Sequence, residues 1–302
     1  MDFKNKAENY RLTAEIAIQD FCASEADKKQ IPPKLYEAMT YSLLAGGKRV
    51  RPVLCMAGAE LIGVKGSFKK VVPMAVALEI FHTSTLIHDD IPCMDNDDMR
   101  RGKPTCHNVY GEALALLAGD AMPLWGISNA IEGLIKNEIP LENIINALKI
   151  FFELAGPAGV LGGQSLDINS DKEKDMEDII ITTSMKTGDL IKASVKTGAV
   201  LAGVSGEKLK SIDSYGYYLG TCFQIVDDIL DETATLNNLG KTPGKDREHV
   251  KNTYVSLLGL EEARALAESC TNNAISALDL SYPEEKGEFL RDFAKYLLNR
   301  AF

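Results

Sequence analysis

The sequence has few of the residues that would stabilise a small fold through disulfide bonds or bind zinc. Its 302 residues include six cysteines and four histidines, with no Cys-x-x-Cys pair and no zinc-like clustering of cysteine with histidine. Glycine (24) and proline (11) are too few to break up long regular segments often. We therefore expect reduced, structural thiols and a protein held together by a hydrophobic core.

Positive charge is also scarce. The chain has 33 Lys and Arg against 43 Asp and Glu, which gives a formal net charge of -10. Nucleic-acid-binding domains usually present a basic face, so no nucleic-acid partner is expected. Any anionic substrate must be held by a local group of cations.

Targeting and membrane-spanning segments are not apparent. Residues 1–10 are polar and lack the apolar region of a signal peptide. No window approaches the ~18 apolar residues that a spanning helix needs. These features predict a cytoplasmic protein without membrane insertion.

The hydrophobic pattern is helical almost throughout. Apolar residues recur at spacings of three and four, strict alternation is nearly absent, and no segment resembles an interdomain linker. The sequence predicts an all-α fold of about ten helices in a single domain, residues 1–302. Helices are expected near residues 5–24, 34–45, 50–63, 71–91, 111–133, 141–155, 175–203, 207–232, 253–280 and 285–300.

Two acidic clusters end otherwise apolar helices. In the second, Asp227 and Asp231 are four residues apart and so lie on one helix face, next to Asp228. Their carboxylates repel unless a cation joins them. Magnesium does this with one or two carboxylates and keeps its other positions for water and phosphate, so the cluster points to diphosphate binding.

The first cluster contains Asp89, Asp90 and Asp95. Pro92 disfavours helix in the residue before it, so Asp95 is expected to return from a turn instead of continuing the helix face. A solvated acidic helix end is the ordinary explanation for one such pair. Two pairs, each closing an apolar helix, make that explanation less attractive.

Basic residues accompany both clusters. Gly46-Gly47 precede Lys48, Arg49 and Arg51, which are suited to phosphate through the arginine fork and the lysine point charge. Arg100 and Arg101 follow the first acidic cluster, and Lys241 follows the second. A basic surface turn that balances nearby aspartates is the alternative for the Arg pair.

These motifs together resemble the short-chain trans-isoprenyl diphosphate synthases, the farnesyl and geranylgeranyl diphosphate synthases. The resemblance spans about residues 34 to 260 and keeps the order GGKRVRP, DDIPCMDNDDMRRGKPT, GGQSLDI, MKTG, FQIVDDILD and LGK. It implies an all-helical homodimer with a deep central cavity, which joins isopentenyl diphosphate head-to-tail to dimethylallyl, geranyl or farnesyl diphosphate. It also implies magnesium, with three ions in each active site.

The resemblance assigns the metal site to the two acidic clusters. It implies Asp89, Asp95 and Asp227 as the main ligands, with Asp90, Asp228 and Asp231 supporting them or binding through water.

The same resemblance divides the other polar residues between two substrates. It implies Arg100, Lys186, Thr187, Gln224 and Lys241 around the allylic substrate, and Lys48, Arg51, His82 and Arg101 around isopentenyl diphosphate. Thr187, Gln224 and the Lys186 carbonyl would offer oxygen dipoles to the allylic cation, and the departing diphosphate would take the final proton.

His82 alone is ambiguous. A single histidine on an apolar helix is more often a satisfied core residue, and the family match reverses that reading. Glu79 and His82 also fit the Glu-x-x-His pattern of di-iron bundles, but the sequence contains no second copy.

Residues one turn before Asp89 could set product length, because a chain growing beneath that helix end would meet them. Thr85 falls beneath Asp89 on an ideal wheel, whereas Ser84 is assigned to the floor by resemblance. Bacterial farnesyl synthases usually carry a bulky aromatic residue at the Ser84 position. The small residue here favours geranylgeranyl over farnesyl diphosphate. The preference is only slight, because Met122, Trp125, Phe151 or Phe152 could close the floor from a neighbouring helix instead.

Two other functions stay open. A non-catalytic partner subunit of a prenyl synthase would share the scaffold but typically loses a motif, and this chain keeps all of them. A class I terpene cyclase shares the first acidic motif, but its second site usually combines Asn, Ser and Glu where this sequence has DDILD.

Overall fold

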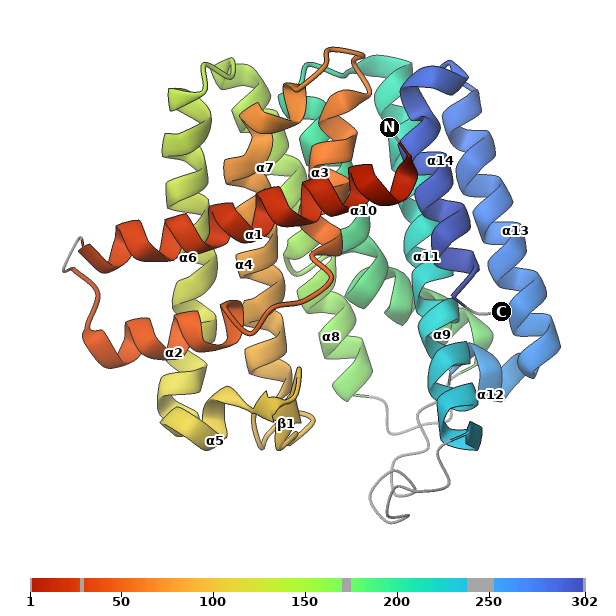
Figure 1. Cartoon of the computed structure of the whole chain (residues 1–302). Coiled ribbons are helices and arrows are strands. Elements are labelled where there is room, and N and C mark those ends of the chain that lie inside the picture. Colours follow the sequence, from red (N-terminus) through yellow and green to blue (C-terminus); the bar gives the residue numbers. More distant parts are fainter. Residues whose placement is uncertain (1, 28–29, 170–174, 238–252, 301–302) are drawn as a thin grey trace. The chain divides into compact units, whose positions relative to one another are not determined.

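A computed structural model describes residues 2–27, 30–169, 175–237 and 253–300 (Figure 1). Most elements in these ranges are helices, and the strands found there, β1 (Met99–Arg100) and β2 (Lys103–Pro104), form one short antiparallel hairpin. The prediction of an all-α fold is confirmed. The helices are α1 (Phe3–Asp27), α2 (Pro33–Leu43), α3 (Val50–Glu60), η1 (Ser67–Val71), α4 (Val72–Asp89), α5 (Cys106–Tyr110), α6 (Glu112–Lys136), α7 (Leu141–Ala155), α8 (Val160–Ile168), α9 (Met176–Thr183), η2 (Ser184–Gly188), α10 (Asp189–Leu201), α11 (Gly206–Asn237), α12 (Tyr254–Leu258), α13 (Leu260–Asp279) and α14 (Glu284–Leu298).

The chain divides into two compact units. The first consists of Met1–Leu148 with Thr197–Val204, and the second of Lys149–Lys196 with Ser205–Phe302. Each unit carries one of the two acidic clusters. The assignment of residues 1–302 to a single domain stays a prediction.

Helix α4 forms the centre of the first unit and lies beside α6 (Figure 1). Two glycines of α6, seven residues apart and so on one face, allow this close packing. A Cβ atom on Gly133 would lie 2.7 Å from Cγ of Pro73, and one on Gly126 would lie 3.1 Å from Cγ2 of Ile80. Near the end of α4, where the first acidic cluster begins, a Cβ atom on Gly119 would lie 2.0 Å from Nε2 of His88, so α6 packs against α4 along its whole length.

In the second unit, glycines of two helices pack closely against the π-type turn η2. A Cβ atom on Gly163 of α8 would lie 2.3 Å from the backbone nitrogen of Lys186. A Cβ atom on Gly220 of α11 would lie 2.5 Å from Cα of Gly188. Only residues without a side chain permit these approaches, so α8 and α11 together fix the position of η2.

The helix predictions fail where non-local contacts decide the backbone. The helix expected over residues 175–203 is divided by η2, and the one expected over 253–280 is divided at Gly259, whose φ is +84°. Helix α8 was not predicted, and its Gly163 packs closely against Lys186.

Three helical stretches are long and apolar enough, by length and composition, to cross a membrane. They are Ser67–Asp89, Glu112–Lys136 and Leu141–Ile168. The sequence-based statement that no window approaches this limit was therefore wrong. In Ser67–Asp89, 67% of the apolar window is buried inside the protein, so packing of the first unit accounts for most of its apolar character.

Candidate active site

The first acidic cluster begins at the end of α4 and folds back on it. The Asp95 N–H donates to the Asp89 carbonyl at 2.8 Å, and the Asp97 N–H donates to the Asp90 carbonyl at 3.2 Å. Asn96 adopts a left-handed φ of +52°, which turns the chain sharply. The prediction that Asp95 returns from a turn is confirmed, and the turn brings residues 89 and 95 together.

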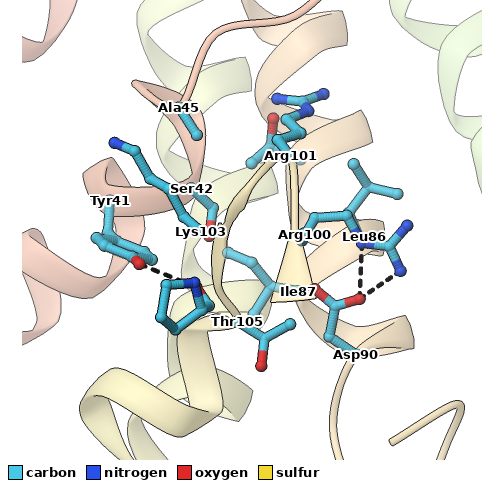
Figure 2. Close-up of a pocket in the computed structure, with 12 residues that line it drawn as sticks. Tyr41, Ser42, Ala45, Leu86, Ile87, Asp90, Arg100, Arg101, Lys103 and Thr105 are labelled. Carbon is cyan, nitrogen blue, oxygen red and sulfur yellow. Dashed lines mark hydrogen bonds and ion pairs between the residues drawn. The ribbon is translucent and has the colours of Figure 1, made fainter. Parts of the chain in front are cut away.

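Asp90 is directed into the protein and is paired with Arg100. Arg100 Nε donates to Asp90 Oδ1 at 2.8 Å, and a second guanidinium nitrogen contacts the same oxygen (Figure 2). Arg100 also donates to Asp97 at 2.9 Å. Burial raises the pKa of Asp90, and the hydrogen bond from Arg100 opposes this shift. Arg100 is therefore fixed beside the first acidic cluster and engages one Asp90 oxygen. Its bond to Asp97 also agrees with the alternative of a basic turn that balances aspartates, and its contact with the allylic substrate stays a prediction.

The turn of the β1–β2 hairpin aims Arg101. Arg101 and Gly102 have φ values of +51° and +76°, and positive φ at both central residues is typical of a type I′ turn. The hydroxyl of Tyr41 on α2 donates to the Pro104 carbonyl at 2.9 Å, which ties the hairpin down (Figure 2). The guanidinium of Arg101 lies against Gly47, where an added Cβ would sit 3.3 Å from Cζ.

Arg49 is a buried anchor of the basic segment. Its side chain is 0% exposed, and it donates to Glu79 on α4 at 2.8 Å and to Glu15 on α1 at 2.8 Å. A third hydrogen bond, of 2.9 Å, reaches the Leu43 carbonyl. Glu79 also lies 3.6 Å from a guanidinium nitrogen of Arg101. These bonds fix the segment that carries Lys48 and Arg51.

Cations surround His82. Burial, followed by the charges of Arg51, Arg101, Arg49 and Arg100, holds the pKa of His82 well below its usual range. Burial also lowers the pKa of Arg101. Glu79 balances part of this charge through Arg49 and Arg101, and an anionic substrate beside the cluster would balance more of it. Lys48 is exposed beside it, and the four residues predicted for isopentenyl diphosphate belong to one region of the first unit.

The second acidic cluster lies on α11. Asp227 and Asp231 are separated by one helical turn, as predicted, and their side chains are partly or fully exposed. Asp227 lies 3.6 Å from a guanidinium nitrogen of Arg300, a residue that the sequence did not suggest. Partial desolvation by the surrounding protein raises the pKa of the Asp231 carboxyl, although the side chain is accessible to solvent.

Asp228 faces a different set of partners. Gln224 Nε2 donates to its Oδ1 at 2.8 Å, and the Tyr254 backbone N–H donates to its Oδ2 at 3.0 Å. The Thr187 hydroxyl donates to the Gln224 side-chain carbonyl at 2.9 Å. The structure thus brings the predicted residues Thr187 and Gln224 into direct contact.

Lys186 points to α8. Its Nζ pairs with Asp167 at 2.6 Å, and both side chains are about one-quarter exposed. On the same helix, the side-chain amide of Gln164 is buried, and neither of its polar atoms has a hydrogen-bond partner among the described residues. Gln164 and Asp167 belong to the GGQSLDI motif, and the sequence analysis assigned no role to the side chains of this motif. Lys241 lies outside the described residues.

The donor set of the acidic clusters fits magnesium. Within the described ranges, no three His, Cys, Asp or Glu side chains converge into a ready-made metal site. Magnesium takes one or two carboxylates and completes its shell with water and substrate phosphate. The partly or fully exposed carboxylates of Asp89, Asp95, Asp227 and Asp231 are oxygen donors of this kind, so an ion accompanied by a diphosphate suits them.

The residues predicted to limit product length are satisfied within α4. The Ser84 hydroxyl donates to the Phe81 carbonyl at 2.7 Å, and the Thr85 hydroxyl donates to the His82 carbonyl at 2.8 Å. Ser84 is only 2% exposed. On the α4 wheel it falls between Ile80 and His88, which both meet glycines of α6. Its small side chain therefore lies on the face of α4 that packs toward α6.

The free energy of unfolding should fall as pH is lowered through ~6.5, because unfolded His82 then takes up a proton that the folded protein excludes. Below that pH the unfolded state binds more protons, so stability rises with pH. The contribution of His82 to the difference in the free energy of unfolding between pH ~7.5 and ~5.5 is at most about 1.4 kcal/mol, and we expect His82→Gln to remove it. Urea unfolding of both proteins at the two pH values measures it, and equal slopes would contradict the assignment.

Comparison with known proteins identifies the family of the chain. The chain matches the family model described as polyprenyl synthetase over residues 32–286. It is 40% identical to a dimethylallyltranstransferase of Fischerella ambigua, over 96% of this chain and 86% of the relative. It is also 40% identical to a geranylgeranyl diphosphate synthase of Cyanophora paradoxa, over 89% of this chain and 88% of the relative. The crystal structure of a geranyltransferase from Legionella pneumophila aligns with a TM-score of 0.83 and 30% identity, over 99% of this chain and 97% of that one. The chain belongs to the polyprenyl synthetase family.

Proposed function

We propose that the protein is a trans-prenyltransferase that condenses isopentenyl diphosphate head-to-tail with allylic diphosphates and releases diphosphate. The observation that carries this proposal is the partly buried group of Arg51, His82 and Arg101 beside an acidic cluster, in a protein of net charge -10. A local group of cations in an acidic protein favours the binding of an anionic substrate. The names of the relatives supply the chemistry of the anion.

Isopentenyl diphosphate is assigned to the first unit. Arg51 and Arg101 grip its phosphates through their planar forks, and Lys48 adds an exposed point charge. His82 is neutral there, because its pKa is lowered by burial and by the surrounding arginines, and it can donate one hydrogen bond without adding to the repulsion. The Glu79 carboxylate, 3.6 Å from Arg101, keeps that guanidinium in place.

The allylic diphosphate is assigned to the acidic clusters and magnesium. Asp89, Asp95 and Asp227 stay the predicted main ligands, and three magnesium ions are proposed for each site. When bound, magnesium neutralises charge on the departing diphosphate. Arg100, held by Asp90, places a fixed positive charge near the same group.

The carbon that loses diphosphate becomes an allylic cation, which needs oxygen dipoles and protection from water. Thr187 and Gln224 are fixed by their mutual hydrogen bond of 2.9 Å, so their dipoles cost no reorganisation during reaction. The second substrate's double bond then attacks the cation, and the departed diphosphate takes the proton that is lost.

The alternatives receive less support. A partner subunit without activity would be expected to lose an acidic or basic motif, whereas this chain keeps them, and Arg100, Lys186 and Gln224 within them are hydrogen-bonded. A terpene cyclase would not need the cations of the first unit for a second diphosphate. The relatives named above are transferases and synthases.

We also propose a homodimer that works in the cytoplasm. Leu116, Leu117 and Leu124 of α6 are exposed, the last by 76%. Exposed apolar side chains grouped on one long helix are typical of surfaces that associate. Sedimentation of the purified protein tests this assignment.

The purified protein, given dimethylallyl and isopentenyl diphosphates with magnesium, should release diphosphate. Asp89→Asn and Asp227→Asn should each reduce turnover about 100-fold or more, because charge on the leaving group is less well stabilised. Glu288→Gln, an exposed carboxylate on α14, serves as the control and should keep full turnover. A folded protein that releases no diphosphate would favour the partner-subunit reading.

Geranylgeranyl diphosphate is the product that we favour, on the small size of Ser84. Ser84→Tyr should shorten the main product by at least one five-carbon unit, because a large side chain fills the α4 face below the acidic cluster. Thr85→Val keeps the side-chain volume and should leave product length unchanged. Chromatographic sizing of the products measures both, and farnesyl diphosphate as the sole wild-type product contradicts the preference.

A further inference from the structure

A chain of hydrogen bonds links four elements of the second unit. It starts at Thr187 on η2, passes through Gln224 and Asp228 on α11, and reaches the backbone of Tyr254 at the start of α12. The Tyr254 hydroxyl then lies 3.0 Å from the hydroxyl of Thr183 on α9, directly before η2. The bonds therefore return to the segment from which they began.

Asp228 occupies a different face of α11 from the two exposed aspartates. Asp227 and Asp231 are one turn apart, and Gln224 and Asp228 are one turn apart on a neighbouring face. Asp228 is 9% exposed, and each of its carboxylate oxygens accepts an N–H hydrogen bond. Its surroundings are those of a residue that organises the protein interior.

The carboxylate determines which way the Gln224 amide points. A carboxylate only accepts hydrogen bonds, so it selects the NH2 end of the amide. The carbonyl end is then turned to Thr187 and takes its hydroxyl proton. The oxygen lone pairs of Thr187 are thereby kept for a group other than Gln224.

We propose that Asp228 is a positioning residue, not a magnesium ligand: it fixes the Gln224 amide and, through it, the direction of the Thr187 hydroxyl dipole. This inference rests on the proposed prenyl transfer, in which Thr187 presents its oxygen to a developing cation. If the amide were reversed, its NH2 group would donate to Thr187. The hydroxyl proton would then be free to point toward the cation and oppose its formation.

The other contacts along this chain of hydrogen bonds hold Gln224 and Thr187 in place. Tyr254 is 1% exposed and is the first residue of α12. A backbone N–H at this position has no partner within the helix, so it is available to Asp228. Gly188 and Gly220 hold η2 against α11 at backbone contact. The distance between Thr187 and Gln224 is therefore set from both sides.

Asp228→Asn tests the proposal, because asparagine has nearly the same shape but presents only one acceptor oxygen. The Tyr254 N–H takes that oxygen, and the new NH2 group forces the Gln224 amide to reverse. We expect kcat to fall about 10- to 100-fold, with an unchanged magnesium concentration for half-maximal rate. Asp227→Asn is the matched control and should raise the magnesium requirement. A raised magnesium requirement in Asp228→Asn as well would overturn the proposal.

The double variant Asp228→Asn with Gln224→Glu restores every bond with the charge moved by one turn. The introduced asparagine would donate to the introduced glutamate, whose second oxygen would accept from Thr187. We expect kcat to recover at least about half of the loss, on a logarithmic scale, relative to Asp228→Asn. A double variant no faster than the single variant contradicts the positioning role.

Stability provides a readout that does not depend on the proposed reaction. Gln224→Glu alone places two carboxylates together and should lower the urea midpoint. Asp228→Asn alone replaces two charge-assisted hydrogen bonds with neutral ones and should lower the midpoint by less. The double variant should have a midpoint near that of the wild type. Additive losses would overturn the hydrogen-bond assignment even if the wild-type protein had no prenyl transfer activity, and absence of that activity with a recovered midpoint would count against the proposed function alone.

Discussion

The buried charge of Arg49 is the constraint on which the first unit depends. A guanidinium with a fully buried side chain is tolerated only if nearly all its donors are satisfied, and Glu79, Glu15 and the Leu43 carbonyl do this. Because these partners lie on different segments, the ion pair joins α1, α4 and the end of α2 at one point. The exposed Lys48 and the cations around His82 are arranged about that point.

The two acidic clusters follow one principle although they lie in separate units. In each Asp-Asp pair the first residue, Asp89 or Asp227, is partly exposed. The second, Asp90 or Asp228, is buried and accepts hydrogen bonds from protein donors, Arg100 in one unit and Gln224 with the Tyr254 backbone in the other. Neighbouring residues on a helix point about 100° apart, so an adjacent pair naturally serves both solvent and interior.

Much of this arrangement was predictable from local sequence. Pro92 indicated that Asp95 returns from a turn, and the four-residue spacing placed Asp227 over Asp231. The hydrogen-bond partners of the buried aspartates were harder to predict. Tyr254 contacts Asp228 across 26 residues of sequence, and no local pattern marks that contact. Glu79 gave a usable signal: a carboxylate inside an apolar helix requires a cation, and Arg49 supplied it. The π-type turn η2 was missed because glycines on two other helices produce it.

Of the adjacent cations Lys48 and Arg49, Arg49 is bound within the fold, and the exposed Lys48 is the one that we propose binds substrate. The most direct test is the free energy of unfolding of Lys48→Met and Arg49→Met, measured side by side in urea. Lys48→Met should change it by no more than about 0.5 kcal/mol, because its side chain is exposed. Arg49→Met should lower it by about 3–5 kcal/mol, because the buried Glu79 loses its 2.8 Å partner and keeps only Arg101 at 3.6 Å. Equal stability of the two variants would contradict this division of tasks.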